Sequence, residues 1–134
     1  MSQENVEVVR QQFRALELGG VDAAAAFWHP EIEWRAVVGA ADDVGVMKGR
    51  DALRRYYSDW TDTFDELRAV VDEVIFAQQD ELVASVRHTG RGRASGVPTD
   101  GRYYVACIVR DGQIVTGREY GTRHQALAAV GRAE

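Results

Sequence analysis

The fold is decided by residues 78–120, which contain the segments ELVASVRHTGRGR (81–93), YYVACIVR (103–110) and QIVTGREY (113–120). Residues 94–101 are expected to form a connection between the first two segments. All three segments are rich in β-branched and aromatic residues, which are enriched in strands. Asp111-Gly112 separates the last two segments and is the strongest short hairpin signal that a sequence offers. We therefore expect this part of the chain to be a run of antiparallel strands.

The residues before these strands predict mainly helices. Apolar residues recur at spacings of three and four in 3–18, and Gly19-Gly20 is typical of a helix end. Asp22 is suited to cap a short second helix that ends before Pro30. The further expected elements are a strand at 31–38, a loop at 39–49 with a short strand near 46–48, a helix at 50–64, a strand at 66–77 with a bulge near Asp72-Glu73, and a helix at 125–130. This order predicts an α+β fold with helices packed on one face of a curved sheet.

Bulk composition narrows the class of protein. The 134 residues fit a single domain spanning 1–134, with 46% hydrophobic and 28% charged residues. A net charge of −5 disfavours nucleic acid or an anionic membrane as the main partner. The single cysteine excludes an internal disulfide and a multi-cysteine metal site. The sequence has no signal peptide and no run of about 20 apolar residues, so we expect a cytoplasmic protein.

Several short motifs, in their order and spacing, resemble the NTF2-like superfamily and its SnoaL-like, ketosteroid-isomerase-like branch. The motifs are LGGVDA (18–23), HPEIEW (29–34), GVMKG (45–49) leading into LRRYY (53–57), RDGQIV (110–115) and REY (118–120). The resemblance covers nearly the whole chain. It implies a cone, in which a strongly curved mixed or antiparallel sheet wraps around three helices and encloses an internal pocket, and it implies a homodimer that pairs through the sheet.

The chemistries of that superfamily fit the chain unequally. Ketosteroid isomerases place a carboxylate late in the first strand and a tyrosine in the first helix, where this chain has 34–37 (WRAV) and Phe13-Arg14. Limonene-type epoxide hydrolases use two carboxylates bridged by an arginine. Arg118-Glu119-Tyr120 resembles one part of that set, but Thr89 stands where the second carboxylate is expected. SnoaL-type polyketide cyclases need only an acid/base residue in a shaped apolar pocket, so their chemistry fits best.

His88 is the first candidate catalytic residue. It alternates in phase with Leu82, Ala84 and Val86, which places it on the apolar face of its strand. An imidazole titrates near neutrality and serves as acid or base. The alternative is a structural histidine bonded to a backbone carbonyl.

Glu119 is the second candidate. It alternates in phase with Val115 and Gly117, so it can face inward, where burial would raise its pKa. The alternative is a surface glutamate paired with Arg118 or Arg87.

Six further residues are expected to line the pocket, although aromatic stripes at helical spacing usually pack in a core. They are Trp34, Tyr57, Trp60, Tyr103, Cys107 and Tyr120. The three histidines lie on distant elements, so we expect no metal site and no cofactor. Asp42 and Asp43 lie in the loop at the pocket mouth, either as lid residues or simply in solvent.

Two functions from different classes remain open. The first is a cofactor-independent acid/base enzyme (isomerase, cyclase, hydratase or hydrolase) that acts on a largely apolar cyclic substrate through His88 and Glu119. The second is a non-catalytic module for ligand binding or dimerisation. A homodimer is expected through the sheet face that carries Val83, Tyr104, Ala106 and Ile108, because these residues would expose more apolar surface than a monomer tolerates.

Overall fold

The computed structural model describes residues 2–132 and confirms the α+β fold. Its elements are α1 (Ser2–Ala25), β1 (Trp28–Arg35), β2 (Val46–Lys48), α2 (Arg50–Thr63), β3 (Phe64–Gln78), β4 (Glu81–Gly92), β5 (Pro98–Arg110), β6 (Gln113–Tyr120) and α3 (Arg123–Ala129). No helix in this range is long and apolar enough to cross a membrane.

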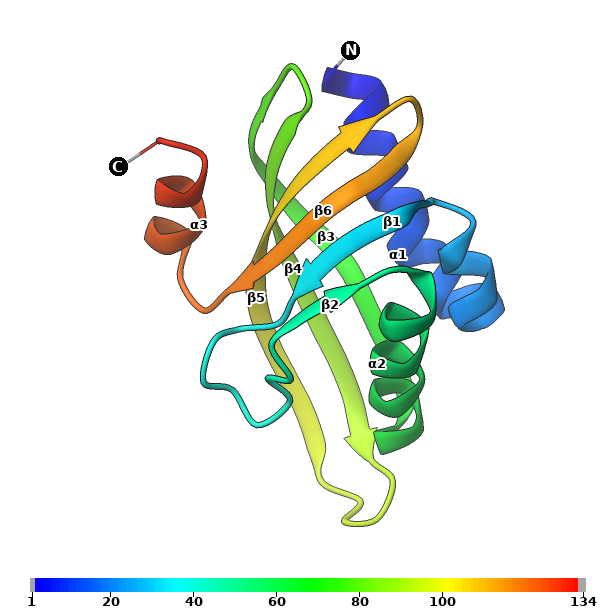
Figure 1. Cartoon of the computed structure of the whole chain (residues 1–134). Helices are drawn as coiled ribbons and strands as arrows, with labels where there is room; N and C mark the ends of the chain where they lie inside the picture. The colour runs from blue at the N-terminus through cyan, green and yellow to red at the C-terminus, as the bar shows by residue number, and fades with distance from the viewer. Residues whose placement is uncertain (1, 133–134) are drawn as a thin grey trace.

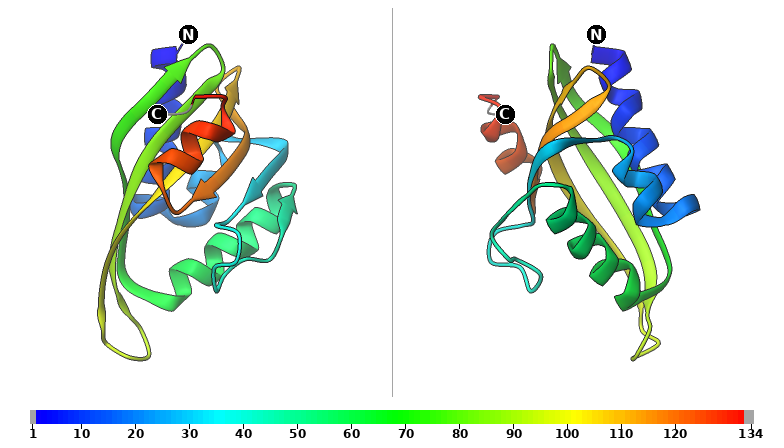
Figure 2. Two further views of the ribbon diagram at one scale, coloured as in Figure 1. Left: turned by 90° about the vertical axis from the view of Figure 1, so that its left-hand side faces the viewer. Right: turned by 45° about the vertical axis from the view of Figure 1, so that its right-hand side comes forward.

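The six strands form one curved, open sheet in the order β2-β1-β6-β5-β4-β3. Neighbouring strands are antiparallel except for β1 and β6, which run parallel, so the sheet is mixed. The sheet curves around α1 and α2, and α3 lies on its opposite side (Figures 1 and 2). The main core therefore lies between the sheet and the first two helices.

α1 consists of two helical segments separated at Gly20, where φ is +81° and ψ is −170°. An L side chain rarely adopts such a conformation, so glycine permits the break. The sequence predicts this break and the apolar stripe before it, in which Val9, Phe13 and Leu16 are buried. Together with α2, the two segments are the helices that the sheet wraps around.

β1 begins earlier than the sequence predicts, at Trp28 instead of Glu31. Trp28 is fully buried, and its Nε1–H donates to Oε1 of Gln12 at 3.0 Å. The backbone N–H of Ile114 in β6 donates to the carbonyl of Phe27 at 2.8 Å. Because Trp28 is buried and its neighbour Phe27 bonds to β6, the strand begins before Pro30. The β1–β6 pairing is irregular between Trp28 and Glu33.

The β4–β5 hairpin is longer than expected, because residues 98–101 continue β5 instead of forming part of a connection. They pair with β4 as far as Arg91↔Pro98, and the N–H of Gly92 donates to the carbonyl of Val97 at 2.9 Å. The bulge predicted near Asp72-Glu73 is confirmed by the register shift between Val71 and Glu73. The hairpin extends β5 so that Gly101 lies opposite His88.

The sheet face expected to be exposed is partly covered by α3. Val83 is 0% exposed and Ala106 is 8% exposed, and both pack with Ala126 of α3 in a second apolar cluster. The expectation that these two residues form an exposed patch is therefore wrong, because the C-terminal helix folds back over them. The homodimer stays a prediction that rests on the family resemblance alone.

Candidate functional site

A cavity of about 200 Å³, here called the inner cavity, lies between α2, the loop after β1 and the inner face of the sheet. Its lining is Val37, Asp42, Tyr56, Tyr57, Trp60, His88, Tyr103 and Glu119. Both candidate catalytic residues and three of the six expected lining residues therefore meet in one place.

Glu119 reaches the inner cavity because of a bulge in β6. Val109 pairs with Ile114 but Ile108 pairs with Thr116, so Val115 is the extra residue. The phase shift places both Ile114 and Glu119 on the buried side, whereas strict alternation would separate them. Glu119 is 9% exposed and faces inward, so the alternative of a surface ion pair is excluded.

Burial also sets the protonation of Glu119. Nε1–H of Trp34 donates to Oε2 at 2.7 Å, the one hydrogen bond of this carboxyl to a described residue. Desolvation raises the pKa of Glu119 to about 8, although the Trp34 bond lowers it in part and the nearby charge of Asp42 raises it further. At neutral pH the side chain is therefore mostly a carboxylic acid, able to donate a proton.

Gly117 positions the Trp34 ring that holds this carboxyl. The two residues pair across β1 and β6, and a Cβ on Gly117 would lie 2.1 Å from Cζ3 of Trp34. The indole therefore occupies the space above Gly117. A glycine inside a strand often marks such a close approach.

His88 lies between two aromatic rings. Its ring centroid is 6.3 Å from that of Trp60 and 5.9 Å from that of Tyr103. Nδ1 is buried and has no hydrogen-bond partner among the described residues, so the alternative of a histidine bonded to a backbone carbonyl through this atom does not hold. Burial lowers the pKa of His88 below its ordinary value of 6.5, opposed by the charge of Asp100. The imidazole is therefore neutral at pH 7.

Gly101 makes room for the His88 ring, because a Cβ there would lie 2.6 Å from Nε2. We predict that Gly101→Ala pushes the imidazole out of its aromatic contacts and raises the pKa of His88 toward 6.5, since the burial that lowers it is relieved. An NMR titration of the His88 ring protons measures the shift. Gly90→Ala is the control, because its nearest neighbour would lie at 3.4 Å. An unchanged His88 pKa in Gly101→Ala would contradict the prediction.

Two tyrosines of α2 contribute hydroxyl groups. The hydroxyl of Tyr57 is buried and has no partner in the part of the chain that the structure describes. Desolvation, the main cause, raises its pKa well above 10.0, so it stays protonated and can donate to a ligand. The hydroxyl of Tyr56 donates to Oδ2 of Asp42 at 2.8 Å and so joins α2 to the loop after β1.

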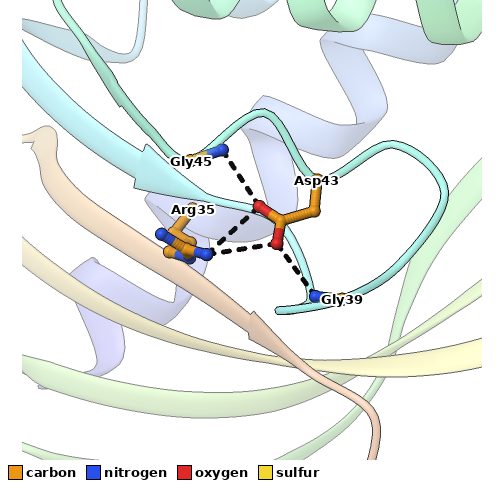
Figure 3. A network of polar contacts seen from close by, with 4 residues as sticks. All are labelled: Arg35, Gly39, Asp43 and Gly45. Carbon is orange, nitrogen blue, oxygen red and sulfur yellow. Dashed lines mark hydrogen bonds and ion pairs between the residues drawn. The ribbon is translucent and has the colours of Figure 1, made fainter.

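Asp43 organises that loop, which carries Asp42 at the cavity. Its carboxylate accepts from the N–H of Gly39 at 2.8 Å and of Gly45 at 3.0 Å, and from Nη2 of Arg35 at 3.1 and 3.2 Å (Figure 3). The two backbone hydrogen bonds, the largest causes, lower the pKa of Asp43. The loop is thus built around one carboxylate, so Asp43 is not simply in solvent.

Three expected lining residues do not line the inner cavity. Trp34 lies behind Glu119 and is fully buried. Cys107 is also in the core, and desolvation raises its pKa to about 12, so it remains a thiol. Tyr120 points to the other face of the sheet, in the cluster with Val83 and Ala106. Among residues 2–132 there is no group of three His, Cys, Asp or Glu side chains placed to hold a metal ion.

Sequence reasoning missed Val37 and Tyr56, and named Asp42 only as a lid candidate. Tyr56 belongs to the aromatic stripe of α2, but only the folded loop shows what its hydroxyl meets. Val37 and Asp42 follow the last paired residue of β1, in a segment where no periodic pattern predicts which way a side chain points. Of the two glycines that shape the site, Gly117 carried a signal, since it interrupts an expected strand. Gly101 carried none, because it was expected in the connection before β5.

The SnoaL-like domain model matches residues 9–117. A protein of Jannaschia sp. CCS1 assigned as a SnoaL-like polyketide cyclase has a similar structure, with TM-score 0.76 and 21% identity over 98% of this chain and 92% of that chain. A Mycobacterium tuberculosis protein in complex with estradiol-17beta-hemisuccinate has TM-score 0.75 and 14% identity over 90% and 95% of the two chains. TerC co-crystallised with polyporic acid has TM-score 0.75 and 16% identity over 89% and 92%. No curated protein matches by sequence.

Proposed function

This chain belongs to the SnoaL-like domain family, and we propose that it is an enzyme that performs cofactor-independent acid/base chemistry on a small molecule in its inner cavity. The observation that carries the proposal is the pair of opposed pKa shifts in one cavity. The pKa of Glu119 is raised to about 8 and that of His88 is lowered below 6.5. Titratable groups whose environments push their pKa values apart are typical of an acid and a base.

Between these two pKa values both groups are in the active form. Glu119 is a neutral acid and His88 is a neutral base, whereas ordinary values would leave a carboxylate and a partly charged imidazole. The neutral imidazole of His88 keeps one ring nitrogen unprotonated, and no described residue bonds its Nδ1. The site can thus remove one proton and supply another at the same pH, with no further group.

The chemistry that fits is enolisation of a ketone. The unprotonated ring nitrogen of His88 takes a proton from the carbon beside the carbonyl, while Glu119 gives its proton to the carbonyl oxygen and the Tyr57 hydroxyl donates a hydrogen bond there. The C–H electron pair becomes the C=C bond of a neutral enol, leaving an imidazolium and a carboxylate. Return of the proton to the same or another carbon gives exchange or isomerisation, and attack of the enol carbon on a second carbonyl closes a ring.

The lining favours an uncharged, largely apolar cyclic substrate. Tyr57, Trp60 and Tyr103 supply aromatic walls, and the about 200 Å³ of space suits a compound of one or two rings. Polyporic acid and estradiol-17beta-hemisuccinate, the ligands of two structural neighbours, both contain rings. An anionic ligand is disfavoured, because the carboxylate of Asp42 lines the cavity.

We predict that the protein catalyses exchange of the α-hydrogens of 2-tetralone, an uncharged two-ring ketone, with solvent deuterium. The rate should decrease as the pH falls through the pKa of His88, which lies below 6.5, because the base becomes protonated. It should also decrease as the pH rises above about 8, because Glu119 loses its proton. His88→Ala and Glu119→Gln should each lower the protein-dependent rate by about 10²–10⁴-fold, the contribution of a positioned acid or base. Proton NMR in D₂O follows the reaction.

Two exposed residues supply matched controls, His124→Ala and Glu81→Gln, which should leave the rate unchanged. A protein-dependent rate that neither His88→Ala nor Glu119→Gln lowers would overturn the assignment. If 2-tetralone binds, seen as quenching of tryptophan fluorescence, but exchanges no faster than in buffer, the alternative of a non-catalytic binding module is favoured.

A further inference from the structure

A second, larger hollow adjoins the inner cavity. This outer groove has a volume of about 720 Å³ and lies between α2 and the loop after β1, two segments that face each other in the right-hand view of Figure 2. Its wall includes the apolar residues Ala41, Val44, Met47, Ala52 and Phe64. Val44 is 68% exposed although it is apolar, so the groove presents a hydrophobic surface to solvent.

The outer groove and the inner cavity share the residues Asp42, Tyr56 and Trp60, which form the boundary between them. One hydrogen bond within this boundary, from the Tyr56 hydroxyl to Asp42 at 2.8 Å, joins helix to loop. A single exposed hydrogen bond contributes little net stability, so its loss opposes the entry of a ligand only weakly.

The volumes indicate how a ligand would use both spaces. Sites for drug-sized ligands measure roughly 300–1,000 Å³. The inner cavity, at about 200 Å³, lies below this range and the outer groove, at about 720 Å³, lies within it. A ligand larger than one or two rings therefore has to extend from the first space into the second.

The charged residues around the outer groove indicate which part of a ligand could bind there. Arg55, Asp59 and Asp42 contribute one positive and two negative charges, so an anionic group gains no net attraction there. We propose that the outer groove is a second binding compartment, which holds an uncharged apolar arm of the same ligand whose ring occupies the inner cavity. This inference rests on the proposed function in one respect, namely that the inner cavity binds a ring.

The test is a series of 4-alkylphenols from phenol to 4-hexylphenol, with binding measured by calorimetry. Competition with 2-tetralone locates the phenol ring in the inner cavity. If the arm lies in the outer groove, affinity should rise about fourfold for each added methylene, the effect of burying one CH₂ group. Phenol itself, which has no arm, sets the baseline of the series.

Two variants assign the effect to the outer groove. Ala52→Trp should fill it, and Val44→Ser should make its wall polar at an exposed position where folding is not at risk. Both should flatten the dependence on chain length and leave phenol affinity within twofold. Two results would overturn the second compartment alone. In the first, phenol binds but affinity does not rise with chain length. In the second, affinity rises with chain length as steeply in both variants as in the wild type. Failure of phenol and every alkylphenol to bind would overturn the ring site and the compartment together.

Discussion

Glu119→Gln is expected to stabilise the folded protein at pH 8.5 while it removes the proposed acid. The carboxyl is buried with one hydrogen bond, and ionisation inside the fold is unfavourable, which is why its pKa is raised to about 8. Glutamine has nearly the same shape, never ionises, and keeps an oxygen to accept from Nε1–H of Trp34. The variant therefore avoids the penalty that the glutamate incurs.

The pH dependence follows from the direction of the shift. The folded pKa of about 8 lies above the ordinary value of 4.5, so the folded state holds a proton that the unfolded state has released. The contribution of Glu119 to stability is thus fully present below about pH 4.5 and is lost as pH rises through about 8. The difference between a pKa of 4.5 and one of about 8 corresponds to a loss of at most about 5 kcal/mol in the free energy of unfolding.

The expected gain for Glu119→Gln at pH 8.5 is smaller than this limit, about 2–4 kcal/mol, because the new amide N–H groups are buried without assured partners. Thermal melts at pH 5.0 and 8.5 measure it, with a rise in Tm on the order of 5–10 °C at the higher pH only. Glu81→Gln, at an exposed position of β4, should show no such difference between the two pH values. A variant equally or less stable than the wild type at pH 8.5 would show that Glu119 is not held neutral by its surroundings.

This result would also separate two reasons for burying a glutamate. A carboxyl that lowers stability at neutral pH serves no structural purpose that glutamine could not serve better. It does keep a proton available at pH 7, as a catalytic acid must. Gain of stability together with loss of exchange activity would therefore favour the enzyme over the binding module.

The inward positions of His88 and Glu119 could be predicted because strand side chains alternate with a period of two. For Glu119 only Gly117 gives the phase correctly, since Val115 is the bulged residue. The direction was still correct, because Gly117 and Glu119 both follow the bulge. Trp34 and Tyr57 were recognised as large aromatic residues, but only packing places one behind the carboxyl and the other at the cavity.

The remaining parts of the site depend on contacts between segments far apart in the chain. The hydrogen bond between Asp42 and Tyr56 requires the loop conformation that Asp43 sets, and the repeated glycines and aspartates of that loop do not specify it. The position of α3 over Val83 was also hidden, since the short helix has the same apolar residues whichever surface it covers. Local sequence patterns predict secondary-structure elements and their buried faces. The Asp42–Tyr56 bond and the position of α3 depend instead on which elements contact one another.

Gly117→Ala is expected to destabilise the protein by about 2–4 kcal/mol, although alanine normally suits a strand better than glycine. The added Cβ would lie 2.1 Å from the ring of Trp34, which is 1% exposed and has no free space to move into. Displacement of the indole also weakens its hydrogen bond to Glu119. Because that bond lowers the pKa of the carboxyl, its loss should move the high-pH limit of exchange activity above about 8.

A double variant separates the steric effect from the hydrogen bond. Trp34→Phe in the Gly117→Ala background makes room for the new methyl group and should recover part of the stability, but it cannot restore the Nε1–H donor, so the upward shift of the pH limit should remain. Urea denaturation measures stability, and Gly121→Ala is the control, since its Cβ would meet nothing closer than 4.0 Å. If Gly117→Ala were as stable as Gly121→Ala, the indole would not be fixed above Gly117, and the account of how Glu119 is held would have to be abandoned.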